Sequence, residues 1–305
     1  MNALVTGANG FVGRALCEEL RARGVIVRAV VRSPVETAAQ ETSVVPDFER
    51  ADWPRMLHDV DCVFHLAALA HVPSDTSVAR LWAANVRTSE IVARAAARAR
   101  TRRLVFLSTT KVHGDQSAAA GFREDDPLSP DDAYGMSKAA AEIAVAASGA
   151  AYTIVRPPLV YGPAVRANFL ALMRAVDRML PLPAGNIRNL RSTLYVRNLA
   201  DAMLFLAQHA GAANEAFGVS DFDDLSTPEL LRRIGEALGK PPRLFALPSP
   251  ALRLARTLSP VKTRMDKLTA TCTVDTTRIR RLGWAPPYTM KEALQATALW
   301  YRRSR

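Results

Sequence analysis

The fold is decided by a stretch near the start of the chain, Ala3-Leu-Val-Thr-Gly-Ala-Asn-Gly-Phe-Val-Gly13. Its first residues have the short apolar pattern of a buried strand. Apolar residues then recur at Val12, Leu16 and Leu20, which is the spacing of a helix, and Gly24 is the expected end of that helix. The sequence therefore predicts a strand, a glycine-rich turn and a helix in direct succession.

The turn carries three glycines at the spacing G-x-x-G-x-x-G. Gly7 permits a tight turn, Gly10 lets the backbone approach a pyrophosphate, and Gly13 lets the helix pack closely on the strand. The first turn of the helix offers free N–H groups and the positive end of its dipole to phosphate groups. We therefore expect a dinucleotide to bind at this turn.

Strand-like and helix-like segments alternate in the rest of the first half of the chain. Strands are expected over 25–31, 61–67, 103–108 and 152–156, and helices over 81–99 and 133–147. This alternation indicates βαβ units. The predicted fold class is α/β, a Rossmann-type doubly wound parallel sheet with a smaller C-terminal α/β substrate domain.

The pattern becomes less regular after about residue 160. Short helical patterns cover 168–180, 198–209, 227–238 and 290–301. We expect residues 1–160 to form the NAD(P)-binding domain, with about 190–212 returning to it, and residues 161–305 to form the smaller domain.

Composition narrows the class of protein. Of the 305 residues, 49% are hydrophobic and 23% are charged, as in ordinary globular proteins. No stretch approaches the roughly 20 apolar residues of a membrane-spanning helix, and no secretory signal is recognisable, so we expect no membrane insertion and a cytoplasmic location. Three separate cysteines and five scattered histidines predict no metal site. The net charge of +11 is dispersed along the chain, so we expect no nucleic-acid partner.

The end of the second expected strand bears on which cofactor would bind. An NAD site usually has an acid there, which binds the ribose 2′-hydroxyl. This chain reads Ala29-Val-Val-Arg-Ser33, with no acid, and Arg32 could pair with a 2′-phosphate. The residues favour NADP(H), with NAD(H) as the alternative, although Arg32 could also be a solvated loop residue.

Tyr134 and Lys138 lie four residues apart near the start of an expected helix, so both project from one face. A lysine ammonium close to a phenol favours the phenolate and lowers its pKa from about 10 toward neutrality. Such a tyrosine can donate or accept a proton while hydride moves. We therefore expect Tyr134 and Lys138 to be catalytic residues.

Four motifs together carry a family resemblance. They are Thr6-Gly-x-x-Gly-Phe-x-Gly13, Phe64-His-Leu-Ala-Ala68, Ser108-Thr-Thr-x-Val-x-Gly114 and Tyr134-x-x-x-Lys138. With them the chain resembles an extended short-chain dehydrogenase/reductase, and more narrowly a nucleotide-sugar epimerase/dehydratase. The likeness includes Arg156-Pro-Pro-Leu-Val-Tyr-Gly-Pro163, and the segment from Leu182 to Ser192 is similar to the branch that acts on UDP-activated N-acetylated sugars.

The resemblance implies roles at matching positions. Thr109 would hydrogen-bond the reacting sugar oxygen, Tyr134 would be the acid/base, and Lys138 would bind the nicotinamide ribose and tune Tyr134. The implied cofactor-binding residues are Gly7, Asn9, Gly10, Phe11, Val12, Gly13, Arg32, Asp47, Phe48, Leu66, Ala67, Ala68, Asn85, Tyr134, Lys138 and Pro157. The implied substrate-binding residues are Thr109, Thr110, Lys111, Asn168, Arg191 and Lys267. Family members are often dimers, so a homodimer is a further expectation.

Some residues leave alternatives open. Ser108 could replace Thr109 as the working hydroxyl, although the spacing to Gly114 favours Thr109. His113 stands where the family often has Tyr, and it either lines the pocket or packs structurally. Asp131 and Asp132 precede Tyr134, where helix N-capping favours acids, so we expect a capping role rather than catalysis.

Three functions remain in competition. The leading one is NADPH-dependent reduction of the C4 ketone of a UDP-4-keto-6-deoxy-N-acetylhexosamine, for surface polysaccharide synthesis. The alternative is a UDP-glucose or UDP-N-acetylglucosamine 4-epimerase with bound NAD. A non-catalytic NADP-binding sensor is the third, and the presence of both Tyr134 and Lys138 argues against it. A 4,6-dehydratase is disfavoured because Thr110-Lys111 stands where that activity commonly has Asp-Glu.

Overall fold

The computed structural model describes residues 1–70, 76–246 and 269–304. Its larger sheet has seven parallel strands in the order β3-β2-β1-β4-β5-β6-β10. The strands are β1 (Asn2–Thr6), β2 (Ile26–Val31), β3 (Glu41–Val44), β4 (Cys62–His65), β5 (Arg103–Leu107), β6 (Tyr152–Arg156) and β10 (Glu215–Gly218). The order reverses between β1 and β4, and ligands of such sheets bind beyond the carboxyl ends of the strands at that point.

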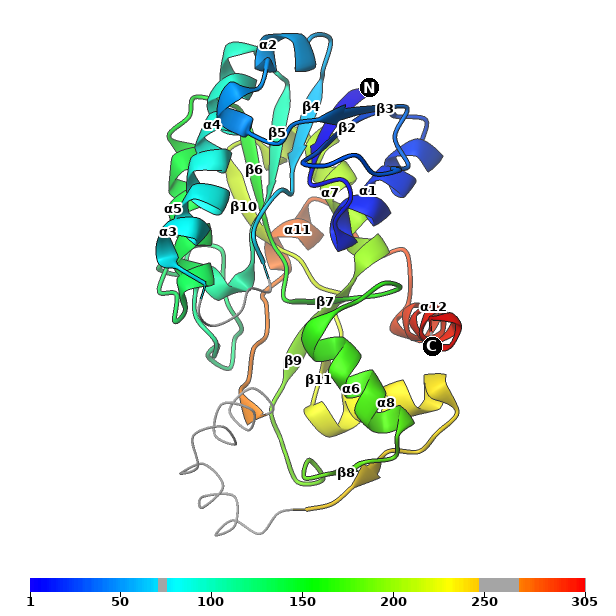
Figure 1. Cartoon of the computed structure of the whole chain (residues 1–305). Coiled ribbons are helices and arrows are strands. Elements are labelled where there is room, and N and C mark those ends of the chain that lie inside the picture. Colours follow the sequence, from blue (N-terminus) through cyan, green and yellow to red (C-terminus); the bar gives the residue numbers. More distant parts are fainter. Residues whose placement is uncertain (71–75, 247–268, 305) are drawn as a thin grey trace.

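Helices cover both faces of this sheet, as Figure 1 shows. Successive residues of a strand point to opposite faces, so Val5 of β1 packs into one core while Leu4 packs into the other. The first core is completed by α1 (Phe11–Ala22) and α7 (Val196–Gln208), and the second by α4 (Thr88–Arg98) and α5 (Ala133–Ala146). Strands buried on both faces are almost continuously apolar, which explains why the sequence predicted them.

Shorter elements complete this part of the molecule. They are α2 (Trp53–Met56), α3 (Val78–Leu81), η1 (Phe48–Arg50), η2 (Trp82–Arg87), η3 (Thr110–Val112), η4 (Ala210–Ala212) and α11 (Thr277–Arg281). The segment η2 is a π-helix that joins α3 to α4. The helix expected over 81–99 therefore begins earlier, at Val78, and its Trp82–Arg87 segment is wound more widely than an α-helix.

A smaller unit follows β6. It contains a three-stranded sheet in the order β11-β9-β7 and a pair of two-residue strands, β8 and β12. The strands are β7 (Leu159–Tyr161), β8 (Pro181–Leu182), β9 (Arg191–Tyr195), β11 (Asp224–Leu225) and β12 (Arg243–Leu244), and the helices are α6 (Ala167–Asp177), α8 (Thr227–Leu238) and α12 (Met290–Arg303). A separate apolar core joins the three helices to this sheet.

Local sequence sets the ends of these helices. Ser226 caps α8 by accepting from Glu229 N over 3.3 Å, and Gly239 ends it with a positive φ of +67°. At α12, Thr289 and Glu292 form a capping box. These signals explain why the helices expected over 227–238 and 290–301 are found almost unchanged.

The chain returns to the large sheet after β7. Helix α7 packs on α1 within the segment 190–212, where a return was expected. Two later segments also return to the large sheet. Strand β10 pairs with β6, and Ile279 of α11 packs in the core that contains α1 and α7. The α/β class and the doubly wound parallel sheet are confirmed, while the assignment of the two units to cofactor and substrate remains a prediction.

Candidate active site

The glycine turn has the geometry that its spacing predicted. Gly7 adopts a positive φ of +70°, and a Cβ placed on it would lie 2.8 Å from Ala67 N. A Cβ on Gly13 would lie 2.2 Å from Gly7 O, so the helix could not approach the strand with any other residue there. Gly10 is the N-cap of α1, where no side chain caps the helix and no acid occupies the first turn. The free N–H groups at this end suit the pyrophosphate of a dinucleotide.

A buried chain of hydrogen bonds connects β1 and β4. Thr6 Oγ1 accepts from Leu66 N and from Ala67 N, each over 3.2 Å, and lies 2.7 Å from His65 Nδ1. His65 Nε2 lies 3.0 Å from Ser89 Oγ, which itself donates to Asn85 O. Burial and the nearby Lys138 lower the pKa of His65 to about 3.

The neutral imidazole has one tautomer that satisfies every partner. Because Ser89 donates to a carbonyl, its oxygen accepts from His65 Nε2–H, and Nδ1 then accepts from the Thr6 hydroxyl. Thr6 is left with its lone pairs for the two backbone N–H groups of the loop after β4. The chain therefore fixes Leu66 and Ala67, which were predicted to line the cofactor.

Asn85 extends this chain to α5. Its Oδ1 accepts from Leu69 N over 2.6 Å, and its Nδ2 donates to Leu69 O over 3.2 Å and to Ser137 Oγ over 2.8 Å. Ser137 Oγ donates in turn to Tyr134 O over 2.8 Å. Asn85 is fully buried, so it holds the loop after β4 and the helix that carries Tyr134 in one arrangement. Asn85 therefore holds the backbone around the predicted cofactor site through these hydrogen bonds.

Lys138 is buried on the inner face of α5. Its Nζ donates to Leu107 O over 2.7 Å and lies 3.9 Å from the centre of the Phe106 ring. Burial lowers the pKa of Lys138 to about 7, against an opposing effect of Glu142. A half-titrated ammonium in this position can donate hydrogen bonds at the carboxyl end of β5.

The pKa of Tyr134 is shifted in the direction opposite to the expected one. Burial, with a contribution from Asp132, raises the pKa of Tyr134 to about 12. The expected lowering by Lys138 is wrong for this structure, because the ammonium is directed at Leu107 O and the Phe106 ring. The phenol is therefore protonated at neutral pH.

The hydroxyl residues after β5 lie where the motif predicted. Thr109 caps η3 by accepting from Lys111 N over 3.3 Å, while Ser108 Oγ is buried and has no hydrogen-bond partner among the described residues. Thr110 N donates to Pro157 O over 3.0 Å. Lys111 Nζ is paired with Asp132 and lies 3.1 Å from Asp115. Asp132 also caps α5 through Gly135 N, as expected for an acid at that position.

His113 has a structural position. It stacks on Phe122 with ring centres 5.4 Å apart, and its Nε2 lies 3.1 Å from Arg156 Nη1. Arg156 also makes a buried bidentate pair with Glu142, at 3.0 and 2.7 Å. Burial and Arg156 lower the pKa of His113. Of the two roles that the sequence left open for His113, these contacts favour structural packing.

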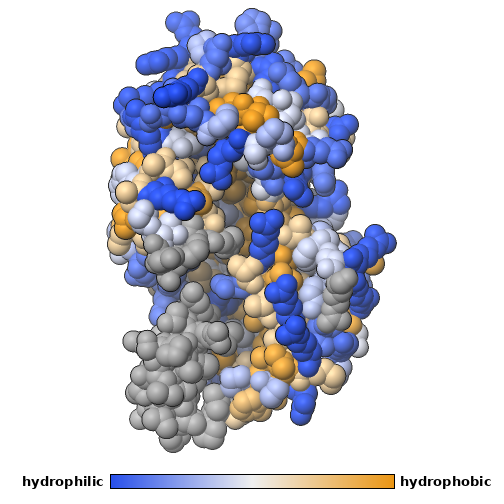
Figure 2. All heavy atoms as spheres, in the orientation of Figure 1, coloured by the Kyte–Doolittle hydropathy of each residue, from blue (hydrophilic) through white to orange (hydrophobic). Residues whose placement is uncertain are grey.

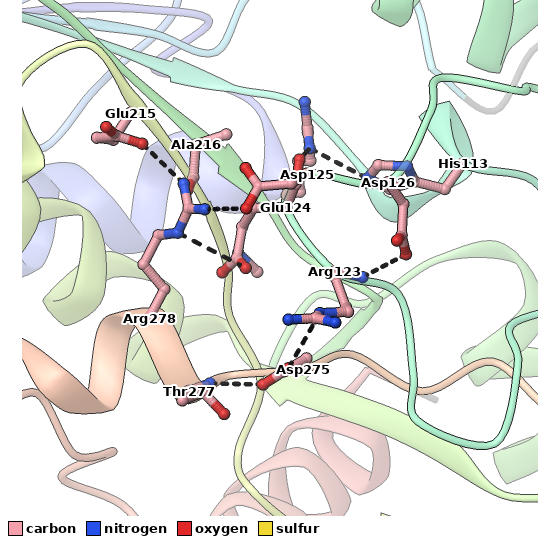
Figure 3. A network of polar contacts seen from close by, with 12 residues as sticks. His113, Arg123, Glu124, Asp125, Asp126, Glu215, Ala216, Asp275, Thr277 and Arg278 are labelled. Carbon is pink, nitrogen blue, oxygen red and sulfur yellow. Dashed lines mark hydrogen bonds and ion pairs between the residues drawn. The ribbon is translucent and has the colours of Figure 1, made fainter.

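A polar network continues from His113 to the edge of the large sheet, as Figure 3 shows. Arg156 Nη1 donates to Glu124 O, and Glu124 Oε1 accepts from Gly218 N over 3.0 Å. Arg278 of α11 donates to Asp125 and to Glu215, each over 2.7 Å. The network fastens the loop between η3 and α5 to β10 and α11.

The remaining predicted residues lie on several separate elements. Arg32 is exposed directly after β2, and Asp47 is the exposed cap of η1. Phe48 is buried, and its ring centre lies 5.4 Å from that of Trp53. Asn9 and Asn168 are exposed, and Ala68 is half-buried.

Two substrate residues remain. Arg191 Nε donates to Ala270 O over 3.2 Å, and burial lowers the pKa of Arg191. Lys267 lies outside the described residues.

The sequence reasoning missed Thr6, Ser89 and Ser137, whose polar side chains inside apolar segments were the only available signal.

Within the three described stretches, no helix is long and apolar enough to cross a membrane.

The chain matches a known protein family and is similar to named proteins. The model of the NAD dependent epimerase/dehydratase family matches residues 3–220. A UDP-glucose 4-epimerase of Vibrio cholerae is 36% identical over 97% of this chain and 94% of its own length. An Escherichia coli O157:H7 protein named N-acetyl-alpha-D-glucosaminyl-diphospho-ditrans,octacis-undecaprenol 4-epimerase is 24% identical over 97% of this chain and 94% of its own length.

Solved structures give the same fold over the full length. MoeE5 in complex with UDP-glucuronic acid and NAD superposes with a TM-score of 0.81 at 27% identity, covering 100% of both chains. UDP-N-acetylglucosamine 4-epimerase from Bacillus cereus superposes with a TM-score of 0.80 at 21% identity, covering 99% of both chains, and shows the fold alone. With the glycine turn, the Tyr134–Lys138 pair and these matches together, the chain belongs to the NAD dependent epimerase/dehydratase family of enzymes.

Proposed function

We propose that the protein is a 4-epimerase of UDP-hexoses that uses bound NAD. The observation that carries this proposal is the 36% identity to the Vibrio cholerae UDP-glucose 4-epimerase over nearly the whole of both chains. Tyr134 and Lys138 share α5, and Lys138 Nζ donates to Leu107 O at the carboxyl end of β5, which supports their proposed catalytic role. The similarity moves the epimerase ahead of the reductase that the sequence motifs had favoured.

The residues present fit a dinucleotide. Gly7 and Gly13 allow no Cβ, and the uncapped N-terminus of α1 suits the pyrophosphate. Bound NAD supplies the acceptor and later the donor of hydride at C4 of the sugar. Ser108 Oγ, buried and unpartnered in the described structure, adds a hydroxyl near the proposed position of the sugar.

Side chains of the protein would transfer the proton of the sugar 4-hydroxyl. Tyr134 would take the proton of the 4-hydroxyl as C4 is oxidised and return it when the ketone is reduced. Its raised pKa makes the phenol the resting form, so Lys138 would be needed to draw the phenolate form into the working range. Thr109 would donate to the sugar oxygen and hold it within reach of Tyr134. Rotation of the 4-keto sugar between the two hydride transfers would invert C4.

The test is conversion without added reductant. Purified protein is mixed with UDP-glucose or with UDP-N-acetylglucosamine, and the C4 epimer is followed by chromatography. We expect interconversion of at least one pair, accelerated by added NAD if the cofactor is lost during purification. Absence of both conversions, in protein shown to contain NAD, would remove the proposal.

A 4-ketoreductase is the second candidate, and Arg32 is the observation that favours it. Arg32 is exposed directly after β2, and no acid stands there to bind a ribose 2′-hydroxyl. Its guanidinium would suit the 2′-phosphate of NADPH. Oxidation of NADPH in the presence of a UDP-4-keto-6-deoxy-N-acetylhexosamine, seen as a fall in absorbance, would support this activity. Its product would serve surface polysaccharide synthesis.

The cofactor and substrate residues are part of the proposal. The large sheet and its returning segments would bind the dinucleotide through the glycine turn, Leu66, Ala67 and Asn85. The smaller unit would bind the UDP-sugar through Asn168 and Arg191. Arg191 suits a diphosphate because a guanidinium binds phosphate through two hydrogen bonds.

A homodimer is also proposed. Four large apolar side chains are exposed on α3, η2 and α5, namely Val78, Trp82, Met136 and Ile143. Helices that expose apolar residues on one side are typical of a protein interface. Light scattering on the purified protein should give twice the chain mass, and Ile143→Glu should reduce that mass to one chain.

A further inference from the structure

A groove of about 450 Å³ lies between α6 and the end of α12, and none of its lining residues belongs to the proposed active site. Its lining on the α6 side includes Arg166, Arg174 and Arg178. On the α12 side it includes Trp300 and Ser304. The volume is in the range of small-molecule sites in proteins.

The arginines share one face of α6. Arg166, Leu170, Arg174 and Arg178 recur every four residues, which places them along one side of a helix. The opposite side of α6 is buried in the core of the smaller unit. Figure 2 shows hydrophilic side chains over α6 with hydrophobic ones beside them. The groove is therefore bounded by a row of cations along its length.

Within residues 1–70, 76–246 and 269–304, none of these three guanidinium groups pairs with a carboxylate. The acid nearest in sequence, Asp177, is instead held by Lys240 Nζ at 2.8 Å and by the Tyr301 hydroxyl at 3.1 Å. On the neighbouring α8, by contrast, Arg232 and Arg233 both pair with Glu229. The positive charge of the groove is thus left without a compensating acid from the described chain.

Helix electrostatics explain only part of this arrangement. Arg174 and Arg178 lie at the C-terminal end of α6, where cations interact favourably with the dipole. Arg166 lies at the N-terminal end, where a cation is unfavourable, and like charges four residues apart weaken a helix. A bound anion would compensate the neighbouring like charges of Arg174 and Arg178, which lie one turn apart.

The aromatic side of the groove indicates what kind of anion. Trp300 is half-buried against the groove, and a tryptophan ring can stack on a nucleobase. Guanidinium groups bind phosphate oxygens through paired hydrogen bonds. A ligand that carries both a flat ring and phosphates uses both sides of the groove.

We propose that this groove is a second nucleotide site, which binds a nucleoside diphosphate independently of the active site. The diphosphate lies against Arg174 and Arg178, and the base lies against Trp300. Binding at this groove requires no turnover, so it stands apart from the proposed epimerase reaction.

Calorimetry with UDP tests the site. The groove variant is Arg174→Ala/Arg178→Ala. Its matched control is Arg21→Ala/Arg55→Ala, which removes two exposed arginines from elsewhere on the surface. Wild type and control should bind two UDP per chain, and the groove variant should bind one, with at least a tenfold loss at the second site. Circular dichroism and melting temperature would show that both variants are folded.

The outcomes separate this proposal from the proposed function. If the active site does not take UDP, wild type binds one UDP per chain and the groove variant binds none, which still supports the groove. Trp300→Leu should weaken UDP at the groove without weakening inorganic pyrophosphate. Equal stoichiometry and affinity of wild type and groove variant would overturn the proposal. So would arginine-dependent binding to phosphatidylglycerol vesicles with no groove-dependent UDP, because the phosphate would then come from a lipid.

Discussion

Asn85 Nδ2 donates a hydrogen bond to Ser137 Oγ over 2.8 Å and thereby joins the π-helical segment η2 to the helix that carries Tyr134 and Lys138. Both partners are fully buried. The same amide group binds the N–H and the carbonyl of Leu69. One side chain therefore links the loop after β4 to α5, and through them it would set the distance between the proposed cofactor and Tyr134.

Asn85→Ala should reduce both stability and turnover. It removes a hydrogen-bond partner from the part-buried Leu69 backbone groups and from the buried Ser137 Oγ, and each unpartnered buried group costs about 1–3 kcal/mol. We expect kcat to fall by more than tenfold while KM for the UDP-sugar changes little, because the substrate side is untouched. Ser137→Ala and the double variant complete a double-mutant cycle. Additive effects on kcat would show that Asn85 and Ser137 do not act together.

Tyr134→Phe should abolish turnover without unfolding the protein. The phenol supplies the proton in the proposed reaction, and general acid–base catalysis contributes about 10²–10⁴-fold. The ring stays, so the melting temperature should change by only a few degrees. Turnover is measured by epimer formation and, for the reductase candidate, by NADPH oxidation. Unchanged turnover in both assays would exclude Tyr134 from the chemistry.

Lys138→Met should stabilise the protein most at low pH. The pKa of Lys138 is about 7 in the folded chain and 10.5 ordinarily, so protonating it costs the folded state on the order of a few kcal/mol. That penalty is fully present below pH 7 and fades as the pH rises toward 10.5. The variant should therefore melt higher than wild type near pH 6, with a difference that shrinks toward pH 10. Melting curves across this range test the sign, and a pH-independent difference would contradict it.

Sequence reasoning reached β1, β2, β4, β5 and β6 of the large sheet because these strands are mostly buried and the helices beside them carry regular apolar spacing. It missed the two edge strands, β3 and β10, and β3 is largely exposed. It did not resolve β7, β8, β9, β11 and β12, which are two to five residues long and are held by partners distant in the chain. The spacing of Tyr134 and Lys138 predicted a catalytic pair, and this role stays a prediction. The direction of the Tyr134 pKa shift was predicted wrongly, because the burial of Tyr134 and the direction of Lys138 toward Leu107 depend on the tertiary structure.

Gly7→Ala should weaken cofactor binding, and the chain provides its own control at Gly24. Both glycines have a positive φ, +70° at Gly7 and +73° at Gly24, so alanine at either costs about 1–2 kcal/mol of backbone strain. A Cβ at Gly24 meets nothing within 4 Å, whereas one at Gly7 meets the Ala67 backbone. We expect Gly24→Ala to lose stability only, and Gly7→Ala to lose at least tenfold in NAD affinity as well. Equal NAD affinity of the two variants, measured by titration, would argue against a cofactor at this turn.

Arg32→Asp should shift cofactor preference toward NAD. An acid at the end of β2 can accept hydrogen bonds from a ribose 2′-hydroxyl, and it repels a 2′-phosphate. Arg32 is exposed, so the substitution should leave the melting temperature nearly unchanged. The ratio of the affinities for NADP and NAD, measured by fluorescence titration of each, should fall by at least tenfold. Arg21→Asp is the control, because it makes the same charge change at an exposed side chain in the last turn of α1, at the end opposite to the glycine turn. If both variants shift the ratio equally, the effect is one of net charge, and Arg32 does not read the phosphate.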